Sequence, residues 1–305
     1  MRIVVPPALT ESHVEIDGEA GRAWSAGLPA LAERYLDQWG LRLAGGAAMH
    51  GYVSLVLPVL RDDGTRAALK LQPVTDENAG EGAALRAWAG QASVRLLDED
   101  RETGTLLLEW LDADRPLSAV PDDTEALEIL TGLLARLVTH PAPPGLRRLS
   151  DIAEAMLADV PESLPELHRE RDRHWLRFCA DAVAELVAEP GDRLLHWDLH
   201  YDNVLGAERE PWLAIDPKPL AGDPGFELAP ALRNRWAEVL ATGDVTRAVL
   251  RRFDLMTDGL GLDRARAAGW TLARVLQNSL WDVADGEDEL DDVQLAIAEA
   301  VSRRL

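Results

Sequence analysis

Cysteine and lysine are the two residue types that this 305-residue sequence nearly lacks. The single cysteine, Cys179, excludes an internal disulfide framework and a cysteine-rich zinc site. Of the 31 basic residues only Lys70 and Lys218 are lysines, and the others are arginines. No apolar run approaches the length of a membrane span, and the first residues do not follow the pattern of a secretory signal. We therefore expect a cytoplasmic protein.

Positive charge is scarce as well. The 31 basic residues stand against 53 acidic ones, which gives a formal net charge of -22. Nucleic acids and anionic membranes are bound by basic surfaces, so we expect neither as a partner. The charge is compatible with a cationic small molecule. Hydrophobic residues at 47% and charged residues at 28% are typical of a folded chain, and the length allows one large or two medium domains.

Residues 1–111 show the pattern of a small antiparallel sheet that follows a helix. Apolar residues at helical spacing predict the helix over residues 19–39. The Asp63-Gly64 turn between two apolar runs predicts a hairpin. We expect one further helix over residues 76–89, packed on the sheet. The expected strands cover residues 41–46, 52–60, 66–72, 94–98 and 105–110.

Residues 112–305 have a different, mostly helical texture, interrupted by short apolar pieces in polar loops. The two parts together predict an α+β fold with two lobes: residues 1–111 form an N-terminal lobe around a five-stranded antiparallel sheet, and residues 112–305 form a helical C-terminal lobe. We expect the C-terminal helices at 124–140, 151–160, 164–188 and over most of 226–305, and short strands at 193–195, 204–206 and 212–216.

The segment with the clearest chemistry carries Asp198, Asn203 and Asp216. Two apolar pieces flank a polar loop, and a further apolar strand ends at Asp216, so the pattern predicts a hairpin with these polar groups at one end. Phosphoryl transfer from a magnesium nucleotide needs a carboxylate at the acceptor hydroxyl, together with an amide oxygen and a second carboxylate that hold magnesium. This segment supplies all three groups.

The order His196-Trp-Asp198, then Asn203, then Asp216 resembles the catalytic loop and the metal-binding aspartate of protein-kinase-like small-molecule kinases. The chain is similar to the aminoglycoside phosphotransferase family, in particular to its streptomycin 6-kinase/hydroxyurea phosphotransferase branch. The resemblance implies a protein-kinase-like fold with ATP and Mg²⁺ as cofactors. It implies that Asp198 is the catalytic base and that Asn203 and Asp216 are magnesium ligands.

The N-terminal lobe carries residues that such a kinase needs. A lysine on the third strand neutralises the nucleotide phosphates, and an acid on the next helix holds that lysine. Lys70 lies on the predicted third strand, and Glu81 lies eleven residues later in the predicted helix. The remaining nucleotide contacts are expected from a glycine loop and from a backbone segment that binds adenine: Gly45, Gly46 and Gly51, and Glu109, Trp110 and Leu111.

Supporting roles follow from the resemblance. His196 is expected to brace the loop through hydrogen bonds, and Asp223 or Glu227 to support it as a structural acid. The Asp-Pro-Lys-Pro stretch is typical of this branch, and two hypotheses remain open for Lys218. It either pairs with a phosphate or a catalytic carboxylate, or it is a surface lysine in a turn.

A small molecule is expected as the acceptor. Trp197 replaces the arginine of regulated protein kinases, and the segment after Asp216 is too short for a long activation loop. Asp202 and Asp282 are candidate contacts for a cationic acceptor such as streptomycin, since carboxylates bind guanidinium groups in bidentate fashion. Hydroxyurea is small and neutral and needs no acidic wall, and other hydroxylated metabolites remain open.

A rival interpretation starts from the alternation of histidine and aspartate in this loop. His196, Asp198 and His200 could bind a transition metal in a metal-dependent hydrolase. That interpretation leaves Lys70 and Glu81 without a role. A kinase-like protein that only binds nucleotide is a third possibility, which the full set of catalytic residues disfavours.

Overall fold

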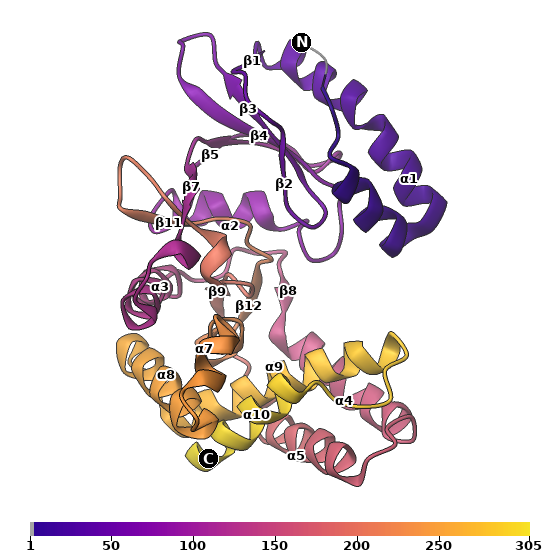
Figure 1. Cartoon of the computed structure of the whole chain (residues 1–305), viewed down its shortest axis with the longest axis vertical. Coiled ribbons are helices and arrows are strands. Elements are labelled where there is room, and N and C mark those ends of the chain that lie inside the picture. Colours follow the sequence, from indigo (N-terminus) through magenta and orange to yellow (C-terminus); the bar gives the residue numbers. More distant parts are fainter. Residues whose placement is uncertain (1–2) are drawn as a thin grey trace.

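The computed structural model describes residues 3–305 and divides them between a sheet-containing lobe and a helical lobe (Figure 1). The sheet and helix α1 lie at one end of the molecule, and the long helices of the C-terminal third lie at the other end. The predicted α+β architecture with two lobes is confirmed. Within residues 3–305, no helix combines the length and the apolar character needed to cross a membrane.

Helix α1 (Pro7–Gln38) is longer than the helix predicted over residues 19–39. It is kinked at Gly18, whose φ of 57° and ψ of -127° lie outside the helical range, so two helical segments meet there. The first segment buries only Leu9 and His13 among its side chains. Two buried positions give no clear apolar stripe, and for this reason the pattern of the sequence revealed only the second segment.

The sheet of the first lobe is antiparallel and has six strands among the described residues, one more than predicted. The additional strand is β2 (Met49–His50), which pairs with β3 where the sequence indicated only a turn. Strands of two residues are too short to show an alternating pattern. The other strands pair in the order β1-β3-β4-β6-β5, and their bounds are Arg42–Leu43, Leu55–Leu60, Arg66–Leu71, Thr105–Glu109 and Leu96–Asp100 in that order.

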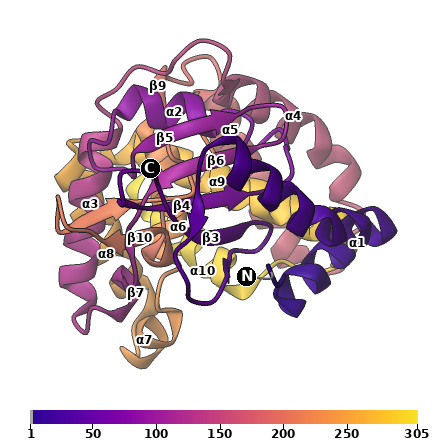
Figure 2. The ribbon, with the colours of Figure 1, turned by 90° about the horizontal axis from the view of Figure 1, so that it is seen from above.

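The two faces of the sheet have different partners. Figure 2 shows α1 crossing one face, where Leu28 and Tyr35 join Leu69 of β4 in one apolar cluster. Successive side chains of a strand point to opposite faces. Lys70 therefore lies on the other face, toward the second lobe, where its ammonium contacts Asp216. Helix α2 (Glu81–Trp88) follows the sheet strands β3 and β4 and packs in the larger apolar cluster of the molecule.

Helix α2 begins five residues later than predicted, and a local turn explains the difference. The side chain of Asn78 accepts a hydrogen bond from the backbone N–H of Thr75 at 2.9 Å and donates one to Pro73 O at 2.8 Å. These bonds hold residues 75–80 in turns and place Glu81 in the first helical turn. At the other end of α2, the indole N–H of Trp88 donates to Leu137 O at 3.2 Å and links the two lobes.

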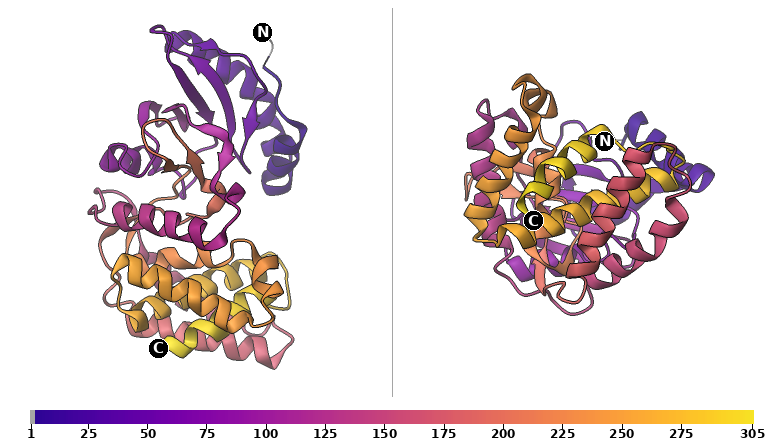
Figure 3. Two further views of the ribbon diagram at one scale, coloured as in Figure 1. Left: turned by 60° about the vertical axis from the view of Figure 1, so that its left-hand side comes forward. Right: turned by 90° about the horizontal axis from the view of Figure 1, so that it is seen from below.

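Helices make up most of the second lobe (Figure 3). Helices α5 and α9 pack side by side and form its centre, with α3, α8 and α10 around them. The predicted helices are present with shifted ends. Their bounds are α3 Asp123–Leu137, α4 Leu149–Ser163, α5 Glu170–Leu186, α6 Leu228–Leu232, α7 Trp236–Ala241, α8 Val245–Leu260, α9 Arg264–Ala284 and α10 Asp292–Val301.

Two small three-stranded sheets lie where the lobes meet. One joins β10 (Val204–Gly206) to β11 (Trp212–Ala214) and to β7 (Asp112–Pro116), which directly follows the first lobe. The other joins β12 (Leu220–Gly222) to β9 (Arg193–Leu195) and β8 (Arg147–Arg148). Strands β9, β10 and β11 were predicted, whereas β7, β8 and β12 were not. These sheets carry the polar loops of the site.

Removing a buried leucine from the sheet should destabilise the protein. Leu69 is 0% exposed beneath α1, and Leu69→Ala should lower the free energy of unfolding by about 2–5 kcal/mol because it leaves a cavity. Leu240 is 56% exposed, and the same substitution there should change the stability by less than about 0.5 kcal/mol. Urea unfolding of both variants measures the difference. Equal losses would contradict the burial of this face.

Candidate active site

The pairing of β10 with β11 brings the polar groups of the catalytic segment together. Val204 lies opposite Ala214, so the residues before β10 and after β11 are at the same end of the hairpin. The N–H of Ile215 donates to Asn203 O at 2.9 Å and closes this end. Asn203 and Asp216 are therefore neighbours, as the apolar pattern of the sequence indicated.

A cavity of ≈ 480 Å³ lies between the lobes in front of this hairpin. It receives groups from the sheet, from the connection between the lobes and from the catalytic loop. Most of the predicted site residues line it, namely Gly51, Lys70, Glu109, Trp110, Leu111, Asp198, Asp202, Asn203, Asp216 and Lys218.

Lys70 is the centre of a buried ion cluster at the back of this cavity. Its ammonium lies 2.8 Å from both carboxylate oxygens of Glu81 and 2.5 Å from Asp216 Oδ1. Gln72 Nε2 also donates to Glu81, at 2.6 Å. Lys70 is 4% exposed and Glu81 is 1% exposed. One lysine thus joins β4, α2 and the segment after β11, which come from both lobes.

The charged groups of this cluster shift one another's pKa values. Burial alone would lower the pKa of Lys70, but the carboxylates of Asp216 and Glu81 outweigh it and raise that pKa to about 12. Burial would raise the pKa of Asp216, yet the ammonium of Lys70 holds it below its usual value. Burial keeps the pKa of Glu81 above its usual value in spite of Lys70. Lys70 is therefore a permanent cation in the cavity.

The side chain of Asp198 meets a second cation. Lys218 Nζ lies 3.4 Å from Asp198 Oδ2 and 3.6 Å from Glu77 Oε2. The backbone N–H of Lys218 donates to His196 O at 3.0 Å, which fixes the residue beside the catalytic loop. Asn203 Nδ2 donates to Asp198 O at 2.8 Å, so the amide oxygen of Asn203 is left for another partner. Lys218 thus pairs with the carboxylate predicted as the catalytic base.

Glu227 supports the catalytic loop from below. Its two carboxylate oxygens accept hydrogen bonds from the backbone N–H groups of His196 and Trp197, the latter at 2.9 Å. The buried ring of His196 donates from Nε2 to Ile215 O at 2.9 Å. Burial lowers the pKa of His196 to about 4, so its ring is neutral at pH 7 and braces the loop. Asp223 instead caps Gly225 N at 2.8 Å and pairs with Arg266 at 2.7 Å, away from the loop.

Two residues of the site have a backbone conformation that non-glycine residues rarely adopt. Trp197 has a φ of 67° and Asp216 a φ of 58°. A residue in this region costs of the order of 1–3 kcal/mol, and such residues cluster where surrounding structure determines them. Here the hydrogen bonds of Glu227 hold Trp197, and the ion pair with Lys70 holds Asp216.

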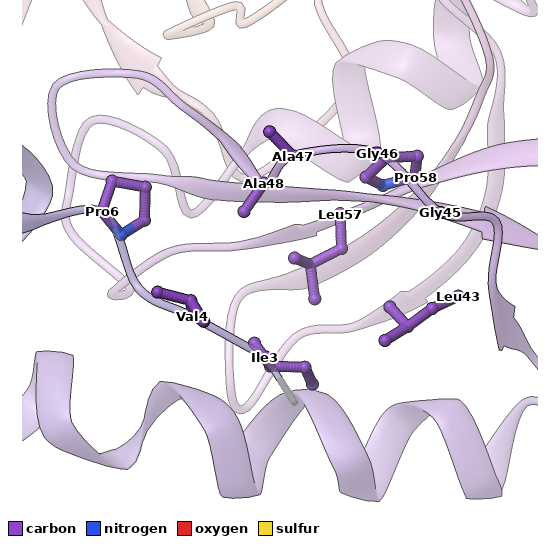
Figure 4. Close-up of a pocket in the computed structure, with 10 residues that line it drawn as sticks. All are labelled: Ile3, Val4, Pro6, Leu43, Gly45, Gly46, Ala47, Ala48, Leu57 and Pro58. Atoms are coloured by element: carbon purple, nitrogen blue, oxygen red, sulfur yellow. The ribbon is translucent and has the colours of Figure 1, made fainter. Parts of the chain in front are cut away.

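Two of the three predicted glycines do not reach the cavity between the lobes. Gly51 lines that cavity, but Gly45 and Gly46 line a separate one of ≈ 340 Å³. Figure 4 shows them close to Pro58, with Ile3 on the opposite side of this second cavity. The prediction grouped Gly45 and Gly46 with Gly51 in one loop because β2, which separates them, was missed. The turn between β2 and β3, at Gly51, is the one that faces the cavity between the lobes.

The predicted adenine-binding segment lies on the wall of the cavity. Glu109, however, uses its side chain elsewhere, because it forms an ion pair with Arg209 at 2.6 Å. Its N–H donates to Arg95 O at 3.0 Å. Trp110 stacks on Arg66, with 4.4 Å from the guanidinium carbon to the ring centroid. Adenine binding by this segment stays a prediction. Since Glu109 is engaged elsewhere, the backbone groups of Trp110 and Leu111 are the remaining candidates for these contacts.

A second, polar pocket of ≈ 280 Å³ adjoins the cavity on the side of the C-terminal helices. Its composition was not predicted, because arginine and asparagine side chains lie beside Asp198 and the candidate contacts Asp202 and Asp282 do not line it. Asp202 lines the larger cavity, whereas Asp282 lines neither the cavity nor the polar pocket. The lining residues are Asp198, His200, Pro230, Arg233, Asn234, Arg274 and Asn278.

Comparisons with known proteins agree with this geometry. The model of the family described as aminoglycoside/hydroxyurea antibiotic resistance kinase matches residues 39–286. The chain belongs to this family. It is 58% identical to streptomycin 6-kinase of Streptomyces griseus over 99% of this chain and 98% of the relative. It is 54% identical to hydroxyurea phosphotransferase of Kitasatospora aureofaciens over 99% of this chain and 87% of the relative.

Solved structures show the same fold at much lower identity. The crystal structure of spectinomycin phosphotransferase in complex with ADP and spectinomycin matches with a TM-score of 0.53 and 12% identity. The match covers 90% of this chain and 96% of that chain. This resistance kinase therefore has a protein-kinase-like fold. Its family assigns it to the small-molecule kinases, which use ATP.

The hydrolase interpretation finds no support in this kinase. The Nε2 atom of His196 is used by Ile215 O, and the ring is fully buried against Trp88 at a centroid distance of 6.1 Å. In the part of the chain that the structure describes, no three His, Cys, Asp or Glu side chains are placed to hold a metal ion together. His196 and His200 therefore do not form the metal site that this interpretation requires.

The pH dependence of stability should report on Glu227. Burial raises its pKa from 4.5 to about 7, so the folded protein binds this proton more tightly than the unfolded chain does. The stability that protonated Glu227 contributes is fully present below pH 4.5 and is lost as the pH rises to about 7. Relative to Glu227→Gln, the wild type should lose about 3 kcal/mol of stability over this range. Urea unfolding at a series of pH values measures the loss.

Glu299→Gln provides the matched control, because Glu299 is exposed on α10. Its stability should follow the wild-type pH curve. Parallel curves for the wild type and Glu227→Gln would contradict the buried carboxylate beneath the loop.

Proposed function

We propose that this kinase transfers the γ-phosphoryl group of ATP to a hydroxyl of an aminoglycoside, with streptomycin as the first candidate acceptor. The observation that carries the proposal is the convergence of Lys70, Asp198, Asn203 and Asp216 on one cavity, with Glu81 bound to Lys70 behind it. The choice of acceptor is supported by the 58% identity with a streptomycin 6-kinase over nearly the whole chain. Since the cosubstrate is ATP, we assign the activity to the cytoplasm.

In the proposed reaction Asp198 accepts a hydrogen bond from the acceptor hydroxyl and takes its proton as the new ester bond forms. Its carboxylate is 24% exposed and lies where the cavity and the polar pocket meet, so an acceptor can reach it. Lys70 neutralises the nucleotide phosphates, and Glu81 holds the ammonium in place. Positioning and charge neutralisation supply most of the rate of such reactions.

Asn203 and Asp216 suit a magnesium ion. Mg²⁺ prefers oxygen ligands, and these residues offer an amide oxygen and a carboxylate. The amide nitrogen of Asn203 is bonded to Asp198 O, which turns the oxygen to a free position. Asp216 uses Oδ1 for Lys70, and its side chain is 40% exposed toward the cavity. A magnesium ion held there neutralises charge on the nucleotide phosphates when it is bound.

Hydroxyurea is the second candidate acceptor, supported by the 54% identity with a hydroxyurea phosphotransferase. A pocket of ≈ 280 Å³ beside Asp198 admits a small neutral molecule completely, but only part of a larger one. Outside this pocket, the exposed Asp202 and the half-buried Asp282 are proposed contacts for the cationic groups of a larger acceptor.

A coupled assay of ADP release with streptomycin, other aminoglycosides and hydroxyurea tests the proposal. We expect Mg-ATP turnover that depends on streptomycin. Turnover with hydroxyurea alone would replace the first acceptor by the second. Thermal stabilisation by Mg-ATP without turnover on any of these compounds would contradict both acceptors and leave the nucleotide site intact.

Asp198→Asn should abolish transfer while it preserves nucleotide binding. The amide is nearly isosteric, but it cannot take the proton of the hydroxyl, so kcat should fall by at least about 100-fold, within the range for loss of a general base. The Kd for Mg-ATP, measured by calorimetry, should change by less than about threefold. Retained transfer with weakened nucleotide binding would refute the role of Asp198.

Lys218→Ala should lower kcat/KM by roughly tenfold, because a hydrogen bond to a charged group contributes about 1.5–3 kcal/mol. The ammonium lies 3.4 Å from Asp198 and orients this carboxylate toward the acceptor. Lys218→Arg should retain most of the activity, since the longer cation still reaches Asp198. An unchanged kcat/KM in Lys218→Ala would assign this lysine to the surface of a turn.

A further inference from the structure

The polar pocket and the nucleotide cavity meet at two residues. Asp198 and His200 line both spaces, and the other lining residues belong to one or the other. A phosphoryl group that leaves the nucleotide for an acceptor held at Asp198 must pass this junction. Groups on the far side of the junction therefore face the transferred phosphoryl from the acceptor side.

Two arginines and two asparagines stand on that far side: Arg233, Asn234, Arg274 and Asn278. Asp198 is the acid among the residues that line the pocket. In a chain with a net charge of -22, a pocket with this lining is unusual, and it favours a negatively charged group. Asn234 contributes a buried amide nitrogen that has no hydrogen-bond partner within residues 3–305.

Arg274 is the buried member of this set. It is 8% exposed, and its Nη1 donates to Gln277 Oε1 at 2.6 Å. Its buried Nε has no partner among the described residues, nor does any described carboxylate oxygen lie within 4.0 Å of the guanidinium. A buried cation without a paired anion costs free energy. Burial accordingly lowers the pKa of Arg274 to about 10, which still leaves it charged at pH 7.

Aromatic rings hold the guanidinium of Arg274 in one position. Its central carbon lies 4.5 Å from the ring centroid of Trp197, 5.4 Å from that of Trp281 and 5.8 Å from that of Phe226. Trp197 directly precedes Asp198 in the chain. The arginine is therefore positioned relative to the catalytic loop before any ligand binds, which is the condition for efficient stabilisation of a transition state.

We propose that Arg274, assisted by Arg233, contacts the transferred phosphoryl group from the acceptor side and neutralises the charge on its equatorial oxygens. The proposal rests on the phosphotransferase activity proposed above. It adds a catalytic arginine on α9 to a site whose other phosphate-binding cation, Lys70, approaches from the sheet. An arginine in such a position suits three charged oxygens, because its planar donors bind two of them at once.

The chemistry of the step is balanced without any further reactant. The bond between the γ-phosphorus and the oxygen that bridges it to the β-phosphorus breaks, and the electron pair stays on ADP. A bond forms between the γ-phosphorus and the acceptor oxygen, whose proton passes to Asp198. Arg274 and Arg233 exchange no proton, and their guanidinium groups supply only charge and hydrogen bonds to the phosphoryl oxygens.

Mg-ADP with aluminium fluoride, which mimics the phosphoryl group in transfer, tests this proposal without knowledge of the acceptor. The melting temperature of the wild type should rise with Mg-ADP and rise again when aluminium fluoride is added. Arg274→Lys should keep the first shift and lose most of the second. Its kcat with streptomycin or hydroxyurea should fall by about 100-fold or more, with the KM for ATP within about threefold.

Arg147→Lys is the matched control. Arg147 also stacks on Trp197, with the same 4.5 Å to the ring centroid, and also has buried unpaired nitrogens, but it does not line the polar pocket. It should keep both shifts. Equal losses in the two variants would overturn the proposal, because both arginines would then act only through Trp197. Retention of the second shift by Arg274→Lys would overturn it as well.

Arg233→Ala keeps the test decisive if Arg274→Lys does not fold, because Arg233 is exposed. A reduced second shift with an unchanged first shift supports the proposal, and two unchanged shifts overturn it. A wild type that responds to Mg-ADP but not to aluminium fluoride also overturns it. A wild type that does not respond to Mg-ADP at all would instead refute the nucleotide site on which the proposed function depends.

Discussion

The rest of the active site depends on the ion cluster of Lys70, Glu81 and Asp216. It joins a strand, a helix and a catalytic segment from two lobes through one ammonium group. Removing Lys70 would leave the buried carboxylate of Glu81 without its cation, which costs several kcal/mol. Because the cluster spans both lobes, its contacts also hold the sheet at a fixed distance from the hairpin of β10 and β11. This distance sets the width of the cavity between the lobes.

The catalytic loop is held from three sides by different kinds of interaction. Glu227 accepts hydrogen bonds from its backbone, the neutral ring of His196 fills the space behind it, and two arginines stack on the faces of Trp197. Regulated protein kinases have an arginine where this chain has Trp197. In this chain the loop instead contributes an aromatic ring, and the cations that stack on it come from β8 and α9.

Charge is distributed unevenly over the molecule. The chain is strongly acidic, yet cations line both spaces beside Asp198, namely Lys70 and Lys218 in the larger cavity and Arg233 and Arg274 in the polar pocket. Arginine and lysine have different places in this arrangement. The two lysines act as compact point charges beside Asp216 and Asp198, whereas the arginines stack on rings and present planar donors. The acids that produce the net charge lie mostly outside the site.

The sequence by itself determined the two-lobed α+β fold and the positions of Lys70, Glu81, Asp198, Asn203 and Asp216 along it. Strand alternation, an Asp-Gly turn and polar groups after short apolar runs are local signals, so they can be recognised without the fold. Only the tertiary structure decided that Gly51, and not Gly45 or Gly46, faces the cavity, and that Arg274 lies beside Asp198. The first depended on a two-residue strand, and the second on helix packing between segments 76 residues apart, and neither leaves a local pattern in the sequence.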